Sequence, residues 1–269
     1  MITRRQLLRG GGASLAGVAA LAAGLGSVVA AQKQKNATAS THRWGMVIDL
    51  DRCTACAACT VACRQENNIP TFGPEEKFDG AHIEWMSMYW DESADGAMPQ
   101  LLPFPCQQCT DPPCVKVCPV GATYKGTDGI TYQIWDRCIG CRYCMVACPY
   151  SRRSFNWTEP KWDAVSVQML NPDVATRPAG VVEKCTFCHH RIKPLVEQAE
   201  MEKRPVRDED CQQLTACAAA CPADAIVFGD QNDPESKVSE LNKSPRRFRV
   251  LEELDTGPNV VYLKRDKAE

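Results

Sequence analysis

The chain has 269 residues, 44% of them hydrophobic and 24% charged, which is the composition of a globular protein and excludes a disordered segment. The formal net charge of −2 provides no strong basic field for a phosphate backbone, so we expect no nucleic-acid partner. Cysteine is the outlier: 17 thiols cannot all pair within one chain and are too sparse for a short disulfide scaffold, so we expect them to hold metal.

Residues 1–31 have the pattern of an export signal. The pair Arg4 and Arg5 precedes an uncharged run from Ala13 to Ala31, and it resembles the twin-arginine type, which carries folded proteins. A retained membrane anchor is the alternative, although a run so rich in Ala and Gly would partition weakly into lipid. Export of a folded protein also suits the cysteine count, because an unfolded chain would present bare thiols to an oxidising compartment. We therefore expect a peripheral protein on the periplasmic side of the cytoplasmic membrane.

Sixteen of the cysteines fall into four groups along the chain. The first and third groups have the spacing C-x2-C-x2-C-x3-C, the second has a longer middle gap, and the fourth is split into two pairs. In chain order the groups are Cys53, Cys56, Cys59 and Cys63; Cys106, Cys109, Cys114 and Cys118; Cys138, Cys141, Cys144 and Cys148; and Cys185, Cys188, Cys217 and Cys221. Cys211 is left over, which leaves open whether it or Cys217 belongs to the fourth group, although the spacing to Cys221 favours Cys217.

This spacing is typical of bacterial ferredoxins, in which three close thiolates hold one iron–sulfur cube and the fourth ligates the other cube of a pair. Only a short segment separates Cys118 from Cys138, so the second and third groups should pair with each other, and the first with the fourth. The ligand sets predicted by this cross-ligation are Cys53, Cys56, Cys59 and Cys221; Cys63, Cys185, Cys188 and Cys217; Cys106, Cys109, Cys114 and Cys148; and Cys118, Cys138, Cys141 and Cys144. We expect four [4Fe-4S] clusters, because no set lacks a ligand.

The expected fold is α+β, with two ferredoxin-like modules, one inserted in the other, and with short strands and many loops. Residues 106–150 are the inner two-cluster module, 44–105 and 151–231 carry the two halves of the outer module with their insertions, and 232–269 are a tail that wraps the surface. Short strands are expected at Met46 to Leu50, Ile130 to Trp135 and Ala225 to Phe228. In three of the four groups, a similar short sequence follows the last cysteine; these sequences begin at Pro119, Pro149 and Pro222.

Three other uses of the cysteines are weaker. Structural zinc suits the split fourth group but not runs of three close thiols, and such runs cannot all find distant disulfide partners. The segment Cys185 to His189 matches the C-x-x-C-H haem attachment pattern, but a haem there would leave Cys217, Cys221 and Cys63 without a role. Basic residues near the ligands could raise cluster potentials or could be solvated; they are Arg52, Arg64, Arg137, Arg142, Arg152, Arg153, Lys184 and Arg191.

From about Trp44 to Leu263 the chain resembles the four-cluster iron–sulfur subunits of the dimethyl sulfoxide reductase, polysulfide reductase and formate dehydrogenase group. The phrases that carry the resemblance are Met46 to Cys63, Cys106 to Pro119, Cys138 to Pro149 and Glu183 to Cys188. Details at Asn171 to Val174, Phe228 to Asp230 and Ser244 to Arg249 are most similar to exported subunits of quinone-linked complexes, among them alternative complex III, the Qrc menaquinone reductase complex and the Dsr transmembrane complex. The chain departs from the family in placing Arg64 after Cys63 and in containing Cys211.

The resemblance implies a respiratory electron-transfer subunit with no catalytic residues of its own. One implied partner is an integral membrane subunit of the polysulfide-reductase anchor type that interacts with quinone. The other is a molybdopterin-type subunit or a multihaem cytochrome c. The alternative is an iron–sulfur subunit of an exported molybdopterin reductase that acts on a sulfur oxyanion or a related substrate.

Overall fold

A computed structural model describes residues 42–70, 83–91, 100–162 and 166–265. The expected export signal lies outside these residues. Within them, no helix is both long enough and apolar enough to cross a membrane.

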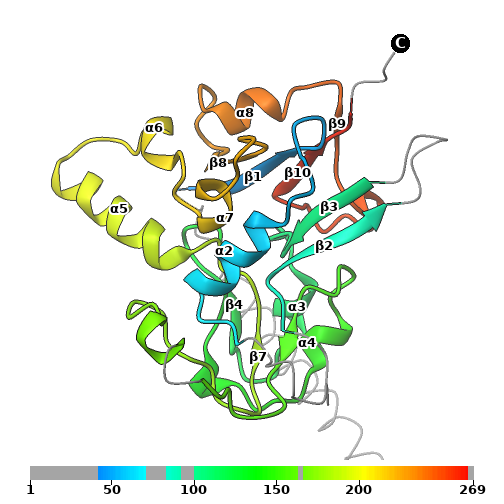
Figure 1. Ribbon diagram of the computed structural model, residues 1–269, viewed down its shortest axis with the longest axis vertical. Helices are drawn as coiled ribbons and strands as arrows, with labels where there is room; N and C mark the ends of the chain where they lie inside the picture. Colours follow the sequence, from blue (N-terminus) through cyan, green and yellow to red (C-terminus); the bar gives the residue numbers. More distant parts are fainter. Residues whose placement is uncertain (1–41, 71–82, 92–99, 163–165, 266–269) are drawn as a thin grey trace, which may run out of the picture. The chain divides into compact units, whose positions relative to one another are not determined.

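The largest sheet has four strands in the order β8-β1-β10-β9 (Figure 1). Strand β1 (Trp44–Asp49) lies between β8 (Ile226–Asp230), with which it is antiparallel, and β10 (Val260–Leu263), with which it is parallel. Every residue of β1 and β10 is buried, as expected of central strands covered on both faces, and β9 (Arg247–Phe248) forms the edge. The tail does not simply wrap the surface, because it supplies β10, a central strand whose continuous apolar run is only four residues long.

The described residues also form three two-stranded sheets, all antiparallel. They are β2 (Met86–Asp91) with β3 (Gln100–Pro105), β4 (Thr123–Lys125) with β5 (Thr131–Gln133), and β6 (Ser154–Phe155) with β7 (Val182–Glu183). The strand expected from Ile130 to Trp135 is therefore shorter, and a 3₁₀ turn, Trp135–Arg137, follows it. Two further 3₁₀ turns span Ser166–Met169 and Glu252–Leu254.

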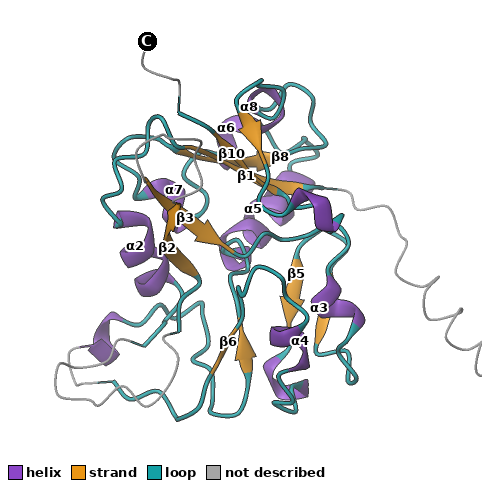
Figure 2. Cartoon of the chain, turned by 90° about the vertical axis from the view of Figure 1, so that its right-hand side faces the viewer, coloured by secondary structure: helices purple, strands orange, loops and turns teal. Residues whose placement is uncertain are grey.

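Most of the helices are a single turn, and several begin inside a cysteine group. Among the described residues the helices are α2 (Ala58–Glu66), α3 (Pro113–Lys116), α4 (Tyr143–Val146), α5 (His189–Met201), α6 (Asp208–Cys211), α7 (Ala216–Ala219) and α8 (Lys237–Leu241). Helices α3 and α4 lie together beside β5, away from the four-stranded sheet (Figure 2). Helix α2 instead packs against α7 and β2.

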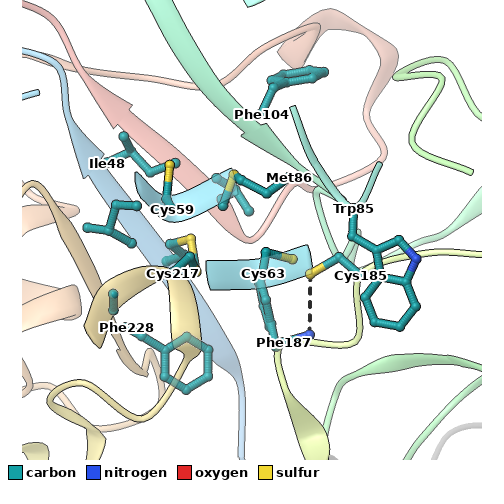
Figure 3. Close-up of a cluster of buried hydrophobic side chains, with 14 of the residues drawn as sticks. Ile48, Cys59, Cys63, Trp85, Met86, Phe104, Cys185, Phe187, Cys217 and Phe228 are labelled. Carbon is teal, nitrogen blue, oxygen red and sulfur yellow. Dashed lines mark hydrogen bonds between the residues drawn. The ribbon is translucent and has the colours of Figure 1, made fainter. Parts of the chain in front are cut away.

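The hydrophobic core combines aliphatic and aromatic side chains with buried cysteines. Trp44, Ile48 and Phe228 of the main sheet share one cluster with Cys59 and Cys63 of helix α2 (Figure 3). This composition explains how a chain with few large aromatic residues fills its interior, because the cysteine-bearing loops pack directly against the sheet. At the edge of the sheet opposite to β9, β8 is held by His42, whose Nδ1 lies 2.7 Å from a carboxylate oxygen of Asp230 at the end of that strand.

Candidate metal centres

The four cysteine groups share one backbone turn. The residue two positions after the first cysteine of each group has a positive φ: Ala55 (57°), Gln108 (47°), Gly140 (67°) and Phe187 (55°). A left-handed residue is unfavourable except in glycine, so its recurrence in three other side chains indicates that the turn itself is required. The turn curls the C-x2-C segment, which places successive thiols on the inside of a loop.

The short sequence that follows the last cysteine in three of the four groups also has a common geometry. The residue three positions on is left-handed, and its amide donates to the carbonyl of the cysteine: Gly121 to Cys118 (3.3 Å), Ser151 to Cys148 (3.2 Å) and Asp224 to Cys221 (3.2 Å). Cys63 lacks this turn because helix α2 continues to Glu66. The departure noted in the sequence, Arg64 in place of proline, is therefore the reason that α2 runs on.

Three cavities in the structure are each lined by four cysteines. These sets are Cys53, Cys56, Cys59 and Cys221; Cys106, Cys109, Cys114 and Cys148; and Cys118, Cys138, Cys141 and Cys144. Each set joins three cysteines of one group to one cysteine of another, in the combination expected from cross-ligation. Even Cys53 and Cys221, which come from the first and the fourth group, are brought to one cavity.

The cysteines of the remaining predicted set, Cys63, Cys185, Cys188 and Cys217, lie close together in the core. The side-chain amide of Asn67 donates to Cys63 Sγ (3.7 Å) and to Cys188 Sγ (3.9 Å), and the charges that act on Cys63 come first from Cys185, Cys188 and Cys217. In Figure 3, Cys63 lies between Cys217 and Cys185, and the amide of Phe187 donates to Cys185 Sγ at 3.4 Å.

Burial and mutual repulsion make these thiols poor acids in the absence of a positive partner. Burial, with nearby thiolates acting in the same direction, raises the pKa of Cys59 to about 11 and the pKa values of Cys109 and Cys185 to about 12. Burial acts in the same direction on Cys63 and Cys217, whose pKa values lie well above the ordinary value. Thiolates are the metal-binding form, so sets of this kind are suited to a cationic iron core that offsets the repulsion.

Donors directed at sulfur surround the same sets. Backbone amides of Thr123 and Ala225 donate to Cys118 Sγ (3.4 Å) and Cys221 Sγ (3.3 Å). Hydrogen bonds to cysteine sulfur are one of the means by which proteins set iron–sulfur potentials. In the described part of the chain no three His, Cys, Asp or Glu side chains converge closely enough for a single metal ion. The donor sets line cavities, as an inorganic cluster requires.

The structure also places two residues of the alternative readings, Cys211 and His189. Cys211 is buried in helix α6, where burial first, and then the charges of Asp208 and Asp230, raise the pKa of its thiol to about 12. Cys217 is the one that lies with Cys188. His189 of the C-x-x-C-H segment packs edge-on against the Tyr132 ring, with 5.2 Å between ring centroids.

The basic residues divide into buried and exposed members. Arg152, Arg153 and Lys184 are buried, whereas Arg52 and Arg142 are exposed. The sequence reasoning missed Lys125, whose ammonium donates to the carbonyl of Cys109 at 2.6 Å and whose pKa burial lowers to about 8. No local motif marks Lys125, because the fold of β4 brings it to a cysteine in a different part of the sequence.

A buried ion pair, also missed, ties the two parts of the Cys63 set together. Arg177 and Glu183 are both fully buried, with 2.5 Å between Nε and a carboxylate oxygen. Arg177 also donates to the carbonyls of Asn67 (2.7 Å) and Asn68 (2.9 Å), just beyond helix α2. Since α2 carries Cys63 and the strand of Glu183 leads into Cys185, the pair holds these two cysteines in register.

Comparison with known proteins supplies the remaining observations. Two 4Fe-4S dicluster domain families match the chain, at residues 98–171 and 137–225. The iron–sulfur cluster-binding subunit of menaquinone reductase from Nitratidesulfovibrio vulgaris is 50% identical over 230 residues, which cover 83% of this chain and 89% of the relative. A putative dimethyl sulfoxide reductase iron–sulfur subunit from Halobacterium salinarum is 40% identical, covering 82% and 78%. A polysulfide reductase chain from Wolinella succinogenes is 33% identical, covering 82% and 94%.

Proposed function

This protein belongs to the family of iron–sulfur electron-transfer subunits of quinone-linked reductase complexes, and on that premise we propose that it carries single electrons through four [4Fe-4S] clusters. The electrons pass between a membrane subunit that interacts with quinone and a second redox subunit. Like its relatives, the chain is an electron-transfer subunit and not the catalytic subunit of its complex.

The four sets of cysteines described above each hold one cluster. The observation that carries this assignment is that three cavities are each lined by one complete set, and the fourth set gathers around Asn67. When bound, a cluster supplies reversible one-electron transfer at a potential set by hydrogen bonds, charge and exposure. The protein supplies the thiolates, the amide donors and the dry surroundings.

The sets follow one another in a line. Cys59 and Cys63 are one turn apart on helix α2, so the first two sets adjoin there. Among the charged groups that affect the pKa of Cys185, in the second set, Cys106 of the third set has the largest effect, so the second and third sets are neighbours. Cys114 and Cys144 pack in one hydrophobic cluster and connect the third set to the fourth. Such a line lets electrons move in short steps.

Under this proposal the two modules are nested in the manner expected from the sequence. Two complete sets lie within residues 106–150, and the other two combine cysteines from before and after that segment. This arrangement supports an inner two-cluster module inserted in an outer one.

The partners dock at the two ends of the line. Cys56 in the first set and Cys141 in the last are exposed, whereas every cysteine of the Cys63 set is buried. Exposed apolar side chains adjoin the end carrying Cys141, namely Ile139, Tyr143 and Val146, the last 83% exposed. Exposed apolar groups beside a terminal cluster suit a docking surface that excludes water.

Residues 1–31 direct export by the twin-arginine route to the periplasmic side of the membrane, where the chain sits on an integral subunit of the polysulfide-reductase anchor type. Replacing Arg4 and Arg5 by lysine should retain the protein in the cytoplasm with its iron. Detection of that variant in the periplasm at the normal level would contradict the assignment.

A second candidate is the iron–sulfur subunit of an exported molybdopterin reductase. The relatives named dimethyl sulfoxide reductase subunit, polysulfide reductase chain and selenate reductase subunit favour it. The second candidate requires a molybdopterin companion subunit, whereas the first also allows a multihaem cytochrome c, so a native complex with such a cytochrome and no molybdopterin protein would exclude the second candidate. Mass spectrometry of the native complex distinguishes them.

The proposed function is tested by adding a menaquinol analogue to the intact membrane complex without oxygen. Paramagnetic signals of reduced clusters should appear, and the isolated chain should give none with the same quinol. Clusters that reduce in the isolated chain at the same rate, or not at all in the complex, would contradict the proposal.

A further inference from the structure

Arg153 lies between the two cavities of the inner module, as a buried side chain that is only 5% exposed. Its side chain lines the cavity of Cys106, Cys109, Cys114 and Cys148. Its Nη1 donates to Thr123 Oγ1 (3.2 Å) and Gln133 Oε1 (3.0 Å), and both of these residues line the cavity of Cys118, Cys138, Cys141 and Cys144. One guanidinium therefore touches the walls of both sites.

The charges that act on this guanidinium come first from the thiolates of Cys114, Cys144 and Cys106, and within the described residues its Nη2 is buried without a nitrogen or oxygen partner. An unpaired buried charge is strongly unfavourable, so a neighbouring anion is required. Burial alone would disfavour the cation, but the thiolate charges of Cys114 and Cys144 outweigh it and raise the pKa of Arg153.

The required anion is supplied by the cofactors that the cavities suit. An oxidised [4Fe-4S] cube with four thiolates has a net charge of about −2, and reduction adds one more negative charge. A cation beside it stabilises the reduced form more than the oxidised form, because the attraction grows with the charge.

We propose that Arg153 is a tuning residue that holds one positive charge between the two inner-module clusters and thereby raises the reduction potentials of both. The inference rests on the ligand sets of the proposed function. It adds a specific cause for the potentials of two of the four centres.

The neighbouring Arg152 is a matched control. It is also buried, at 8% exposed, but its guanidinium donates to the carbonyls of Tyr150 (3.1 Å) and Phe104 (3.2 Å) and to the hydroxyl of Ser87 (2.7 Å). Most of its hydrogen bonds are therefore donated to residues of β2 and β3. Tyr150 lines the cavity of Cys106, Cys109, Cys114 and Cys148, but none of these partners lines the cavity of Cys118, Cys138, Cys141 and Cys144. Replacement of Arg152 therefore removes an equal buried charge while leaving the wall of that second cavity intact.

The test is a redox titration of the full, cluster-loaded chain followed by paramagnetic resonance, in wild type and in Arg153→Gln, Arg153→Lys and Arg152→Gln. Arg153→Gln should shift the reduction equilibrium of two clusters at least about tenfold toward oxidation, which is about 59 mV for a one-electron couple. The potentials of the other two clusters should not move, and Arg153→Lys should stay near wild type. Arg152→Gln should leave the potential of the cluster held by Cys118, Cys138, Cys141 and Cys144 unchanged. A Cys141→Ser variant identifies which signals belong to that pair.

Unchanged potentials in a fully loaded Arg153→Gln protein would overturn the inference, as would equal shifts in all four clusters. If Arg153→Gln does not load, Arg153→Lys decides, because a large fall in its potentials would mean that the hydrogen bonds matter and the charge does not. An iron-free wild-type chain would instead refute the proposed function, which keeps the two failures distinguishable.

Discussion

Cys63 provides a sharp test of the cross-ligated arrangement, because its nearest cysteine in sequence is not expected to share its cluster. Cys59 precedes it by one turn of helix α2, yet Cys63 lies among Cys185, Cys188 and Cys217. We predict that Cys63→Ser damages the cluster of those three distant cysteines and spares that of Cys59.

The size of the effect follows from burial. The exposed fractions in the Cys63 set are 6% for Cys63, Cys188 and Cys217 and 9% for Cys185, so solvent has poor access to replace a lost ligand. Of about sixteen iron atoms per chain, Cys63→Ser should therefore remove at least one, which would leave a three-iron cluster, and at most the four of this cube. Cys56 is exposed, so water can replace it as a ligand. The Cys56→Ser protein should therefore keep the cluster of Cys53, Cys59 and Cys221 to a greater extent than Cys63→Ser keeps its own.

The assay combines iron analysis with paramagnetic resonance of dithionite-reduced protein. The signal lost in Cys63→Ser should be the one lost in Cys188→Ser and should differ from the one altered in Cys56→Ser. Cys211→Ser is the matched control, because that thiol is also buried but the charges acting on it come first from Asp208 and Asp230. Its iron content should equal that of wild type.

The reasoning would be refuted if Cys63→Ser and Cys56→Ser affected the same signal while the signal lost in Cys188→Ser persisted. Equal iron loss in the Cys211→Ser control would also refute it, since the seventeenth cysteine would then be a ligand.

Three further predictions concern the scaffold. Gly140→Ala should impair loading of its cluster, because an added Cβ would lie 2.4 Å from a backbone oxygen, whereas Gly121→Ala, with a similar positive φ and open space, should cost only about 1–2 kcal/mol, as measured by iron content and thermal release of iron. Arg177→Met should destabilise the fold by about 3–5 kcal/mol by leaving Glu183 buried and unpaired, and adding Glu183→Met should recover much of the loss in hydrogen-exchange protection. The hydrogen bond to its carboxylate partner raises the pKa of His42, so the stability advantage of wild type over His42→Ala should be full below about pH 6.5 and disappear as pH rises through the raised value, in melting curves across that range; a pH-independent difference would exclude it.

The parts of this protein that follow from local spacing could be predicted from the sequence. The strands expected at Met46 to Leu50 and Ala225 to Phe228 correspond to β1 and β8, because each is a short apolar run that can be read from the local sequence. The preference for Cys217 over Cys211 rests on the short gap to Cys221, and the structure places Cys217 with Cys188.

The parts that depend on distant pairing could not be predicted in this way. Strand β10 is too short and too far from β1 for periodicity to reveal that the two are neighbours. Likewise, nothing near Arg177 or Lys125 in the sequence indicates that one pairs with Glu183 and the other caps the Cys109 carbonyl. Such contacts arise only when tertiary packing has brought the loops together.

The central claim is that sixteen cysteines hold four iron–sulfur cubes, and Mössbauer spectroscopy of iron-57-labelled chain, purified without oxygen and quantified per polypeptide, tests it most directly. We expect about sixteen iron atoms, all in spectra typical of [4Fe-4S] centres, together with an equal amount of acid-labile sulfide. A chain that contains zinc in place of iron, or only about eight iron atoms, would contradict the claim.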